Sequence, residues 1–388
     1  MSRALSGGNP TLPAGIPVLV LDGSWTLALR TVRALGRTRT WDIHLIADRR
    51  RAICPAGSSR YVRSSFTPKA DEGSDAWWDE VLDRAKEVGA RVLFPLCEES
   101  SLGCIRHRER IERVTKLVPL DNEDTYRVVI DKGSLARHLA EAGLPFPKSV
   151  HLRPTELDHP GLREIRFPLI VKPTRGAFGN GIKRVENPAE LMDALASGSA
   201  EQELLVQEFI EGSDADCSFI AVGGELVVST TQKSNTPDSA VFQASGNVHV
   251  DEIPDLTEAA RDLVRSLNFT GIANVDFRWG TDGKPYLLEV NARIWASLLA
   301  SVAAGVNFPD IFCRLALGLP VHVPDRRSIH FSTLGLGLCR TLRHPFRAAG
   351  STPRHPLTEL GLAMRDPLPE LFSRLRVLTR RMNFPPAR

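Results

Sequence analysis

Asp276, Glu289 and Asn291 carry the side chains of this chain that point most directly to chemistry. The dipeptide Asp282-Gly283 separates two runs of alternating apolar residues, which is the strongest short-range signal for a β-hairpin. A two-residue turn at this dipeptide places Asp276 directly opposite Glu289 on the neighbouring strand. Asn291 follows Glu289 by two residues, so the strand period puts its side chain on the same face. The sequence therefore predicts a cluster of three oxygen-bearing side chains.

Carboxylates that face each other across an antiparallel pair lie about 5 Å apart at Cβ and repel each other unless a cation lies between them. Mg²⁺ takes carboxylate and amide oxygens as ligands and keeps water and phosphate oxygens as further ones. The hairpin thus predicts a Mg²⁺ site, with Mn²⁺ as the alternative metal, beside a nucleotide. The same register pairs Thr281 with Lys284 and puts Leu288 on the core face. A loop of another length would shift the pairing and leave an ordinary solvated hairpin.

A second candidate site lies where an apolar strand delivers Lys172 to a glycine-rich loop. The loop contains Gly176, Gly179 and Gly181, and such glycines let backbone N–H groups approach phosphate oxygens closely. A lysine at the mouth of the loop is a strong phosphate partner. The pattern is not a P-loop, because it lacks Gly-Lys-Ser/Thr and the next helix begins only at Asn187. A hairpin tip without a ligand is the alternative interpretation.

Composition bounds the class of protein without choosing its function. The chain has 388 residues, 42% hydrophobic and 24% charged, which predicts a globular protein of two or three domains. Its six cysteines have no Cys-x-x-Cys spacing, so neither a zinc site nor a disulfide framework is indicated and a reducing, cytoplasmic location is expected. No signal-peptide pattern and no bilayer-spanning apolar run is found.

Positive charge is concentrated at the C-terminus. Residues 326–388 hold 12 arginines, no lysine and 3 acids. Within them, residues 366–384 mix leucines with arginines in a pattern compatible with a basic amphipathic helix. Such a helix either packs on the body of the protein or lies on an anionic membrane surface. Nucleic-acid binding is not indicated, because the basic residues are not interleaved with aromatic ones and form no known module.

The N-terminal part alternates strands with helices. Strands are predicted at residues 16–21, 44–47 and 92–96, with helices ending near Gly36 and spanning residues 76–88, and this order predicts a parallel sheet covered by helices. Glu98 and Glu99 directly follow the third strand, where open α/β sheets bind ligands. They are therefore candidate substrate contacts, with a role in the first turn of a helix as the alternative.

The order of these motifs along the chain resembles the ATP-grasp superfamily. Lys132 opens a helix, Ile-Val-Lys-Pro precedes the glycine loop, Val-Gln-Glu-Phe-Ile-Glu-Gly follows it, and Asp276 precedes Glu-Val-Asn-Ala-Arg. The resemblance implies an α/β and α+β fold in four parts. They are a Rossmann-like pre-ATP-grasp domain (1–124), ATP-grasp subdomain A with the glycine loop (125–205), subdomain B with the hairpin (206–320), and a helical, arginine-rich C-terminal tail (321–388).

The resemblance also implies roles for individual residues. Lys132 and Lys172 contact the ATP phosphates, and the loop with Gly176, Gly179 and Gly181 closes over them. Arg293 lies near the transferred phosphoryl group and acts with Lys172 in catalysis. The Mg²⁺ ligands are Asp276, Glu289 and Asn291. The adenine and ribose contacts are Gln207, Glu208, Ile210 and Asp214, with Asp216 as the alternative ribose acid.

The implied chemistry is activation of a carboxylate by ATP, with release of ADP. An amine then displaces phosphate from the acyl phosphate and forms a C–N bond, so both partners are small molecules, and a homodimer is compatible with this. One alternative is an enzyme that activates bicarbonate, of the carboxylase or carbamoyl-phosphate type. The other is a nucleotide-binding protein without turnover. Substrate selectivity is expected from residues 230–247, with Lys233, Gln243 and Ser245 as candidates.

Overall fold

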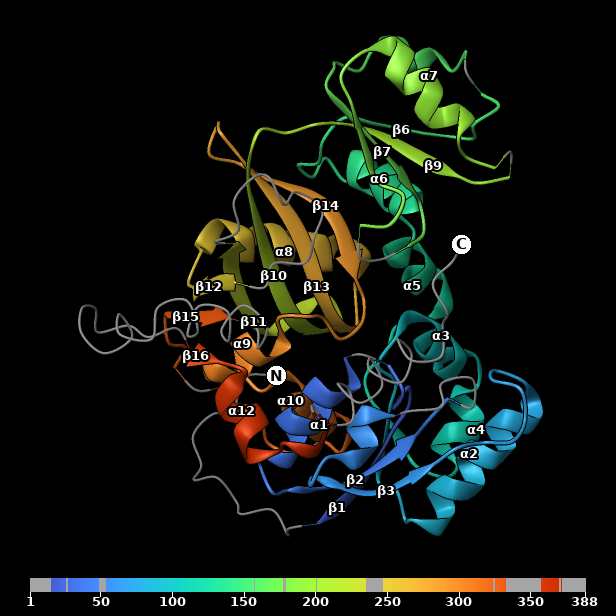
Figure 1. The fold of residues 1–388 in the computed structure, drawn as a ribbon, viewed down its shortest axis with the longest axis vertical. Coiled ribbons are helices and arrows are strands. Elements are labelled where there is room, and N and C mark those ends of the chain that lie inside the picture. Colours follow the sequence, from blue (N-terminus) through green and yellow to red (C-terminus); the bar gives the residue numbers. More distant parts are fainter. Residues whose placement is uncertain are drawn as a thin grey trace, which may run out of the picture. The chain divides into compact units, whose positions relative to one another are not determined.

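The computed structural model describes residues 15–25, 27–48, 54–156, 158–176, 179–199, 201–234, 247–323, 325–332, 357–369 and 371. The chain divides into two compact units, drawn in Figure 1. Unit 1 comprises Met1–Leu120 with Arg293–Arg388, and unit 2 comprises Asp121–Ala292. The predicted fold class, α/β with α+β, is confirmed. The border at residue 292 falls inside the predicted segment 206–320, and the four-part division stays a prediction.

Unit 1 is built on a five-stranded parallel sheet in the order β3-β2-β1-β4-β5. The strand β1 lies at its centre, and Val18, Leu19 and Val20 are fully buried because helices cover both faces of such sheets. The strands are β1 (Ile16–Val20), β2 (Trp41–Ile46), β3 (Val62–Phe66), β4 (Val92–Phe94) and β5 (Lys116–Leu117). The helices are α1 (Ala28–Gly36), α2 (Asp75–Glu87), α3 (Glu98–Arg106) and α4 (Arg108–Glu112).

The described elements after Arg293 belong to unit 1 as well. They are α9 (Leu298–Ala303), α10 (Phe308–Ala316), β15 (Ile329–Ser332), β16 (Leu357–Thr358) and α12 (Leu360–Arg365). Asn307 donates a 2.7 Å hydrogen bond to the carbonyl of Ala34, and the indole of Trp41 donates one of 2.8 Å to Asp310. The segment that follows the predicted metal hairpin is thus fixed to the N-terminal sheet.

A buried ion pair anchors the C-terminal elements to α1. Asp366 accepts hydrogen bonds from Arg33 (3.2 Å), from the hydroxyl of Ser59 (2.8 Å) and from the backbone N–H of Arg60 (3.0 Å). The side chains of Arg33 and Asp366 are only 4% and 1% exposed. Every oxygen of this carboxylate therefore has a donor, which is the condition under which a buried charge is tolerated.

Unit 2 contains two antiparallel layers. The first is a four-stranded sheet in the order β6-β9-β7-β8, covered by α7, which is capped by Asn187 as predicted. The second has the order β14-β13-β10-β11-β12, and α8 packs along one face of it (Figure 1). The strands are β6 (Ser149–Leu152), β7 (Leu169–Pro173), β8 (Lys183–Val185), β9 (Leu204–Glu208), β10 (Gly212–Val222), β11 (Glu225–Ser234), β12 (Asn247–Asp251), β13 (Gly271–Gly280) and β14 (Pro285–Asn291). The helices are α5 (Glu123–Ile130), α6 (Lys132–Glu141), α7 (Pro188–Ala196) and α8 (Pro254–Leu267).

The hairpin β13–β14 confirms the predicted facing pair but not the predicted turn. Asp276 stands opposite Glu289. The loop has three residues instead of two, because Gly280 pairs with Lys284, so the prediction that Thr281 pairs with Lys284 is wrong. A register shift after Asp276 compensates for the extra loop residue.

The same shift corrects the predicted core face of β14. Phe277 stands opposite Leu287, so Leu288 becomes the extra residue of a β-bulge. Leu287 is 3% exposed and fills the core, whereas Leu288 is only partly buried. The prediction that Leu288 faces the core is therefore wrong, and the reason is the bulge.

The amphipathic helix predicted for residues 366–384 lies almost wholly outside the described residues. Gln243 and Ser245 of the predicted selectivity region also lie outside them. Lys233 is described, and its ammonium lies 4.6 Å from the centre of the Trp279 ring. In the part of the chain that the structure describes, no helix has the length and apolar character needed to cross a bilayer.

We expect Asp366→Ala to lower the free energy of unfolding by about 3–5 kcal/mol, because the variant leaves the buried guanidinium of Arg33 without its partner. The control is Asp83→Ala, which removes the exposed pair of Asp83 with Lys86, whose side chains are 73% and 61% exposed. That change should cost less than about 1 kcal/mol. Urea unfolding measures both, and equal losses would contradict the anchoring role of Asp366.

Candidate nucleotide and metal site

The acidic pair of the hairpin is joined by amide groups. Asn291 donates through Nδ2 to Asp276 (3.0 Å) and to Glu289 (3.3 Å). Asn274 donates at 2.8 Å to the other oxygen of Asp276 and accepts at 2.7 Å from Ser218. The predicted metal ligands thus lie together on one face of the sheet, and the amides fix the direction of the Asp276 carboxylate.

Two lysines bring positive charge to the same place. The ammonium of Lys132 lies 3.0 Å from an oxygen of Glu289. Lys172, which is 5% exposed, donates at 3.0 Å to the side-chain oxygen of Gln207 and at 3.3 Å to the carbonyl of Leu288. The latter carbonyl belongs to the bulged residue of β14, so the bulge supplies an acceptor to the buried ammonium.

The charges of this cluster shift one another's proton affinity. Burial lowers the pKa of Lys172 to about 8, although the carboxylates of Glu289 and Asp276 oppose that change. Burial raises the pKa of Glu289, but Lys132 and Lys172 outweigh burial, so the pKa lies well below its ordinary range. At neutral pH Lys172 and Glu289 are therefore both mainly charged.

The glycine loop connects β7 to β8 and contacts one of these lysines. The carbonyl of Gly176 accepts a 3.0 Å hydrogen bond from Lys132. Gly176, Gly179 and Gly181 have φ values of 141°, 72° and 77°, which residues other than glycine rarely adopt. Residues 177 and 178 lie outside the described part of the loop. The phosphate role of these glycines stays a prediction.

The residues predicted for adenine and ribose have protein partners in this structure. Arg278 donates to the carbonyl of Ile210 (3.0 Å) and to the carboxylate of Asp214 (2.6 Å). Gln207 donates from its amide nitrogen to Ser149 (2.9 Å), besides accepting from Lys172. These contacts hold the end of β9 and the start of β10 in position.

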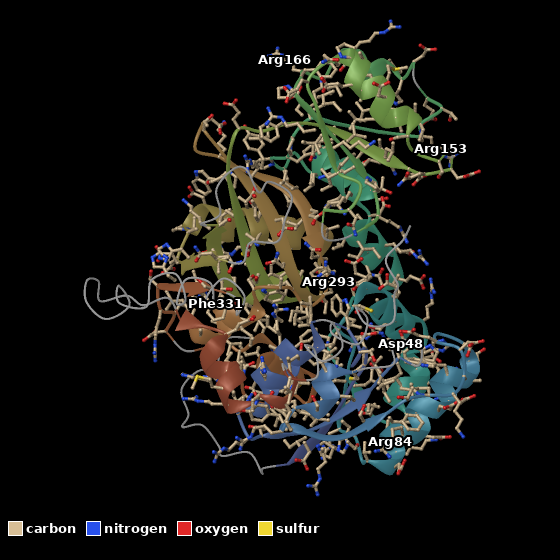
Figure 2. All side chains as sticks on the ribbon, in the orientation of Figure 1. Asp48, Arg84, Arg153, Arg166, Arg293 and Phe331 are labelled. Atoms are coloured by element: carbon tan, nitrogen blue, oxygen red, sulfur yellow. The ribbon has the colours of Figure 1, made fainter. Side chains whose placement is uncertain are left out.

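Two acids complete this part of the site. Glu208 accepts at 2.9 Å from the backbone N–H of Arg166 (labelled in Figure 2). Asp216 stands opposite Asp276 and accepts at 2.6 Å from Gln232. Burial raises the pKa of Asp216 to about 7, and its other oxygen is buried without a hydrogen-bond partner among the described residues. Both Asp214 and Asp216 stay candidates for the ribose contact.

Gly212 is the first residue of β10, and it allows this strand to begin close to β13. A Cβ added to Gly212 would lie 1.8 Å from the carbonyl oxygen of Trp279, a distance that no side chain can accept. The glycine thus allows β10 to pass directly beside β13. Through this approach, Asp214 reaches Arg278 and Asp216 reaches the position opposite Asp276.

The donor set fits a hard divalent cation. Asp276 and Glu289 supply carboxylate oxygens, and the amide of Asn291 carries an oxygen besides the nitrogen that donates here. Within the described residues, no group of three or more His, Cys, Asp and Glu side chains forms a metal cluster. Two carboxylates with additional phosphate and water oxygens are the usual arrangement for Mg²⁺, so these residues would hold that ion together with a nucleotide.

Arg293 belongs to unit 1, although it follows Asn291 by only two residues in the chain. Figure 2 labels it. It is 9% exposed, its Nε lies 3.5 Å from an oxygen of Glu98, and its guanidinium carbon lies 5.5 Å from the centre of the Trp25 ring. Glu98 is the first residue of α3, so it occupies the first turn of a helix, as the alternative prediction had it. It also contacts Arg293. Glu99 is exposed.

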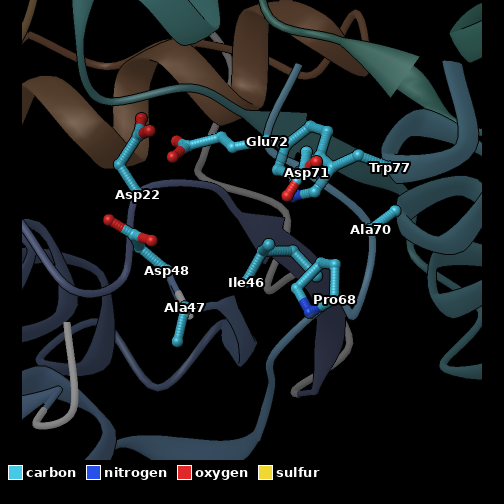
Figure 3. Close-up of a pocket in the computed structure, with 9 residues that line it drawn as sticks. All are labelled: Asp22, Ile46, Ala47, Asp48, Pro68, Ala70, Asp71, Glu72 and Trp77. Carbon is cyan, nitrogen blue, oxygen red and sulfur yellow. The ribbon is translucent and has the colours of Figure 1, made fainter. Parts of the chain in front are cut away.

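A hollow of about 160 Å³ lies at the carboxyl ends of β1, β2 and β3 in unit 1 (Figure 3). Its lining combines four carboxylates with apolar side chains from the strand ends and α2. The lining residues are Asp22, Ile46, Ala47, Asp48, Pro68, Ala70, Asp71, Glu72 and Trp77. These carboxylates disfavour the binding of a further anion, so the hollow does not suit a carboxylate substrate.

Some contributors to the site were not predicted. Ser218, Ser149 and Arg278 act through contacts between strands that are distant in sequence. Asp22 accepts from the backbone of Leu96 (2.9 Å) and from the hydroxyl of Ser100 (2.6 Å), and so joins the ends of β1 and β4. Only Asp22 had a sequence signal, namely a polar residue directly after a buried strand.

The low pKa of Lys172 predicts a pH effect on stability. Between pH 8 and the ordinary pKa of 10.5, the unfolded chain keeps a proton on this lysine that the folded protein has released. Stability must then rise with pH in that interval. We expect the free energy of unfolding of the metal-free protein, measured against Lys172→Met, to increase from pH 8 to 10 and to stay level below pH 7. A difference that is constant with pH would contradict a buried, perturbed Lys172.

Comparison with known proteins agrees with this geometry. Residues 129–297 match a family model described as an ATP-grasp domain. D-alanine–D-alanine ligase of Parabacteroides distasonis is 27% identical over 193 residues, which cover 45% of this chain and 58% of the ligase. The large chain of carbamoyl phosphate synthase from Pyrococcus furiosus is 26% identical over 196 residues, covering 48% of this chain and 18% of the synthase. The match therefore spans a little over half the length of the ligase and less than a fifth of the length of the synthase.

A solved structure extends the likeness in fold. L-amino acid ligase from Bacillus licheniformis superposes with a TM-score of 0.61 at 18% identity, covering 79% of this chain and 75% of the ligase. Residues 129–297, which match the family model, include α6, the glycine loop and the hairpin, and so contain the two lysines and the facing carboxylates. Residues 129–297 of this chain are therefore similar to an ATP-grasp domain.

Proposed function

We propose that the protein is an ATP-dependent ligase that joins a carboxylate to an amine through an acyl phosphate. The observation that carries this proposal is the cluster formed by Asp276, Glu289, Lys132 and Lys172. Phosphoryl transfer needs positioning and charge neutralisation more than a covalent nucleophile from the protein. This cluster offers both. The likeness to D-alanine–D-alanine ligase and L-amino acid ligase supports the same reaction class.

The residues act in the proposed reaction through charge and position. A substrate carboxylate oxygen attacks the γ-phosphorus of ATP, and the bond from that phosphorus to the bridging oxygen of ADP breaks. Lys132 and Lys172 neutralise phosphate charge, and Arg293 binds the substrate carboxylate. When bound, Mg²⁺ supplies charge neutralisation and alignment of the phosphate oxygens.

The second half of the reaction forms the C–N bond. The nitrogen of the amine attacks the acyl carbon, and the bond from that carbon to the phosphate oxygen breaks. Phosphate leaves with one oxygen that came from the carboxylate, and the proton of the amine passes to solvent. Water must be kept from the acyl phosphate until the amine arrives, which is a role suited to a glycine loop that closes over the phosphates.

Loss of the facing carboxylates should remove turnover without unfolding the protein. We expect Asp276→Asn combined with Glu289→Gln to lower Mg-ATP turnover by more than about 100-fold, because even changes outside the ligand shell of a metal cost about 10–100-fold. Asp282→Asn in the exposed loop of the same hairpin is the matched control and should keep its activity. Circular dichroism checks the fold. Unchanged turnover in the double variant would contradict the metal role.

The products distinguish the proposed reaction from its alternatives. Mg-ATP is incubated with pairs of carboxylates and amines, and with bicarbonate, and ADP and AMP are separated. We expect ADP and phosphate with a specific pair, and one ¹⁸O atom in the phosphate when the carboxylate is ¹⁸O-labelled. Stimulation by bicarbonate alone would instead favour the carboxylating alternative. AMP as the product, or unlabelled phosphate, would contradict an acyl phosphate.

A further inference from the structure

Arg278 joins the strand of the predicted metal ligands to the start of β10. It follows Asp276 by two residues on β13, so both side chains lie on the same face of the sheet. Its Nε donates at 3.0 Å to the carbonyl of Ile210, and its Nη1 donates at 2.6 Å to the carboxylate of Asp214. The side chain of Arg278 is only 7% exposed. One buried guanidinium thus fixes a backbone acceptor and a carboxylate at once.

The carboxylate of Asp214 is held through one oxygen and open at the other. Its Oδ1 accepts from Arg278, whereas its Oδ2 accepts no hydrogen bond from any residue that the structure describes. The side chain of Asp214 is 46% exposed, so a ligand can reach it. A carboxylate offers about four acceptor positions on its two oxygens. Asp214 can therefore accept hydrogen bonds from ligand hydroxyl groups while Arg278 keeps its orientation.

Asp216, the other acid weighed for the ribose, is less accessible. One of its oxygens accepts at 2.6 Å from Gln232, so it is already engaged. The second oxygen is closed to solvent and has no hydrogen-bond partner among the described residues. A ligand hydroxyl would have to displace Gln232 or turn the side chain of Asp216. Access therefore favours Asp214.

The spacing along the strands suits a nucleotide whose phosphates lie at the predicted metal ligands. Asp214 stands opposite Arg278, and Asp216 stands opposite Asp276. Asp214 is thus displaced from the metal ligands by two residues, or about 7 Å, along the sheet. In a nucleotide, C5′ and the α-phosphate separate the ribose hydroxyls from the β-phosphate. A ribose can therefore reach Asp214, with the base farther along toward Ile210.

From these contacts we infer that Arg278 is a positioning residue of the nucleotide site. It holds the carboxylate of Asp214 for the ribose hydroxyls and the carbonyl of Ile210 for the exocyclic amine of adenine. A carbonyl oxygen has two lone pairs, so the carbonyl of Ile210 accepts from both donors. The inference rests on the nucleotide binding in the proposed function, and it gives a role to a residue that acts through two others.

Arg278 also neutralises a charge that would oppose binding. Without the guanidinium, the carboxylate of Asp214 would add negative charge beside the phosphates of the nucleotide, which is unfavourable. The guanidinium carbon lies 5.4 Å from the centre of the Phe209 ring, within the roughly 6 Å of a cation–π contact. This contact adds a third constraint on the guanidinium. A preorganised group loses less free energy on binding than a mobile one.

The test is calorimetric titration of the full chain with ADP and with 2′,3′-dideoxy-ADP, which lacks both ribose hydroxyls, in the presence of Mg²⁺. We expect the wild type to bind ADP at least about tenfold more tightly than the analogue, a difference of about 1.4 kcal/mol. Arg278→Met should weaken ADP more than the analogue, so that the two affinities converge. Arg278→Lys keeps the charge without the planar fork of donors, and it should retain part of the difference.

Two further variants separate positioning from a general effect on the fold. Arg184→Met removes the other guanidinium over Phe209, whose carbon lies 4.2 Å from the ring centre, and it should bind both nucleotides as the wild type does. Asp214→Asn should lose the difference between the nucleotides, as Arg278→Met does. Circular dichroism checks the fold of each variant. If Arg278→Met weakens both nucleotides by the same factor, as a structural role would, the inference is overturned.

Other outcomes separate this inference from the proposed function. A wild type that binds both nucleotides alike, or a difference that depends on Asp216 and not on Asp214, overturns the inference. If the protein binds neither nucleotide, the inference and the proposed reaction both fail. If substrates support ADP formation but Arg278→Met keeps the difference, the inference is overturned and the ligase reaction stands. If the difference depends on Arg278 but no substrates support ADP formation, the inference stands and the proposed reaction fails.

Discussion

The repulsion between Asp276 and Glu289 on neighbouring strands is the constraint on which the arrangement of unit 2 depends. Two carboxylates this close need compensating charge, and α6 and β7 bring it as Lys132 and Lys172. Lys172 is buried and Lys132, Asp276 and Glu289 are partly buried, so charges here cost desolvation free energy and add little stability. Their presence is therefore best explained by ligand chemistry. A divalent cation would take over the role of Lys132 at Glu289, and phosphate oxygens would occupy the lysines.

The β-bulge at Leu288 links the backbone of the hairpin to this chemistry. A three-residue loop moves the pairing by one residue, and the bulge restores the register before Glu289 is reached. The extra residue turns its carbonyl toward Lys172, which is one of the acceptors that make burial of this ammonium tolerable. A hairpin without the bulge would place Asp276 opposite Leu288 and separate the two carboxylates.

Local signals in the sequence predicted much of the fold and of the site. Buried strands such as β1, the start of α6 and the cap of α7 are decided by neighbouring residues, so they could be read directly. The turn could not, because its length depends on Gly280 pairing with Lys284 and on Thr281 donating to the distant carbonyl of Glu211. Strand β3 was missed since Val-Arg-Ser-Ser-Phe has few apolar residues. The membership of α9 and α10 in unit 1 follows from packing against α1, which no local pattern records.

Binding of Mn²⁺ in the presence of ADP, followed by electron paramagnetic resonance, tests most directly whether the hairpin is a metal site. Free and bound ions give distinct signals, so the measurement does not depend on knowing the substrates. The account predicts one Mn²⁺ that binds at least about tenfold more weakly after Asp276→Asn with Glu289→Gln, and as in the wild type after Asp282→Asn. Equal affinity in the wild type and the double variant would contradict it.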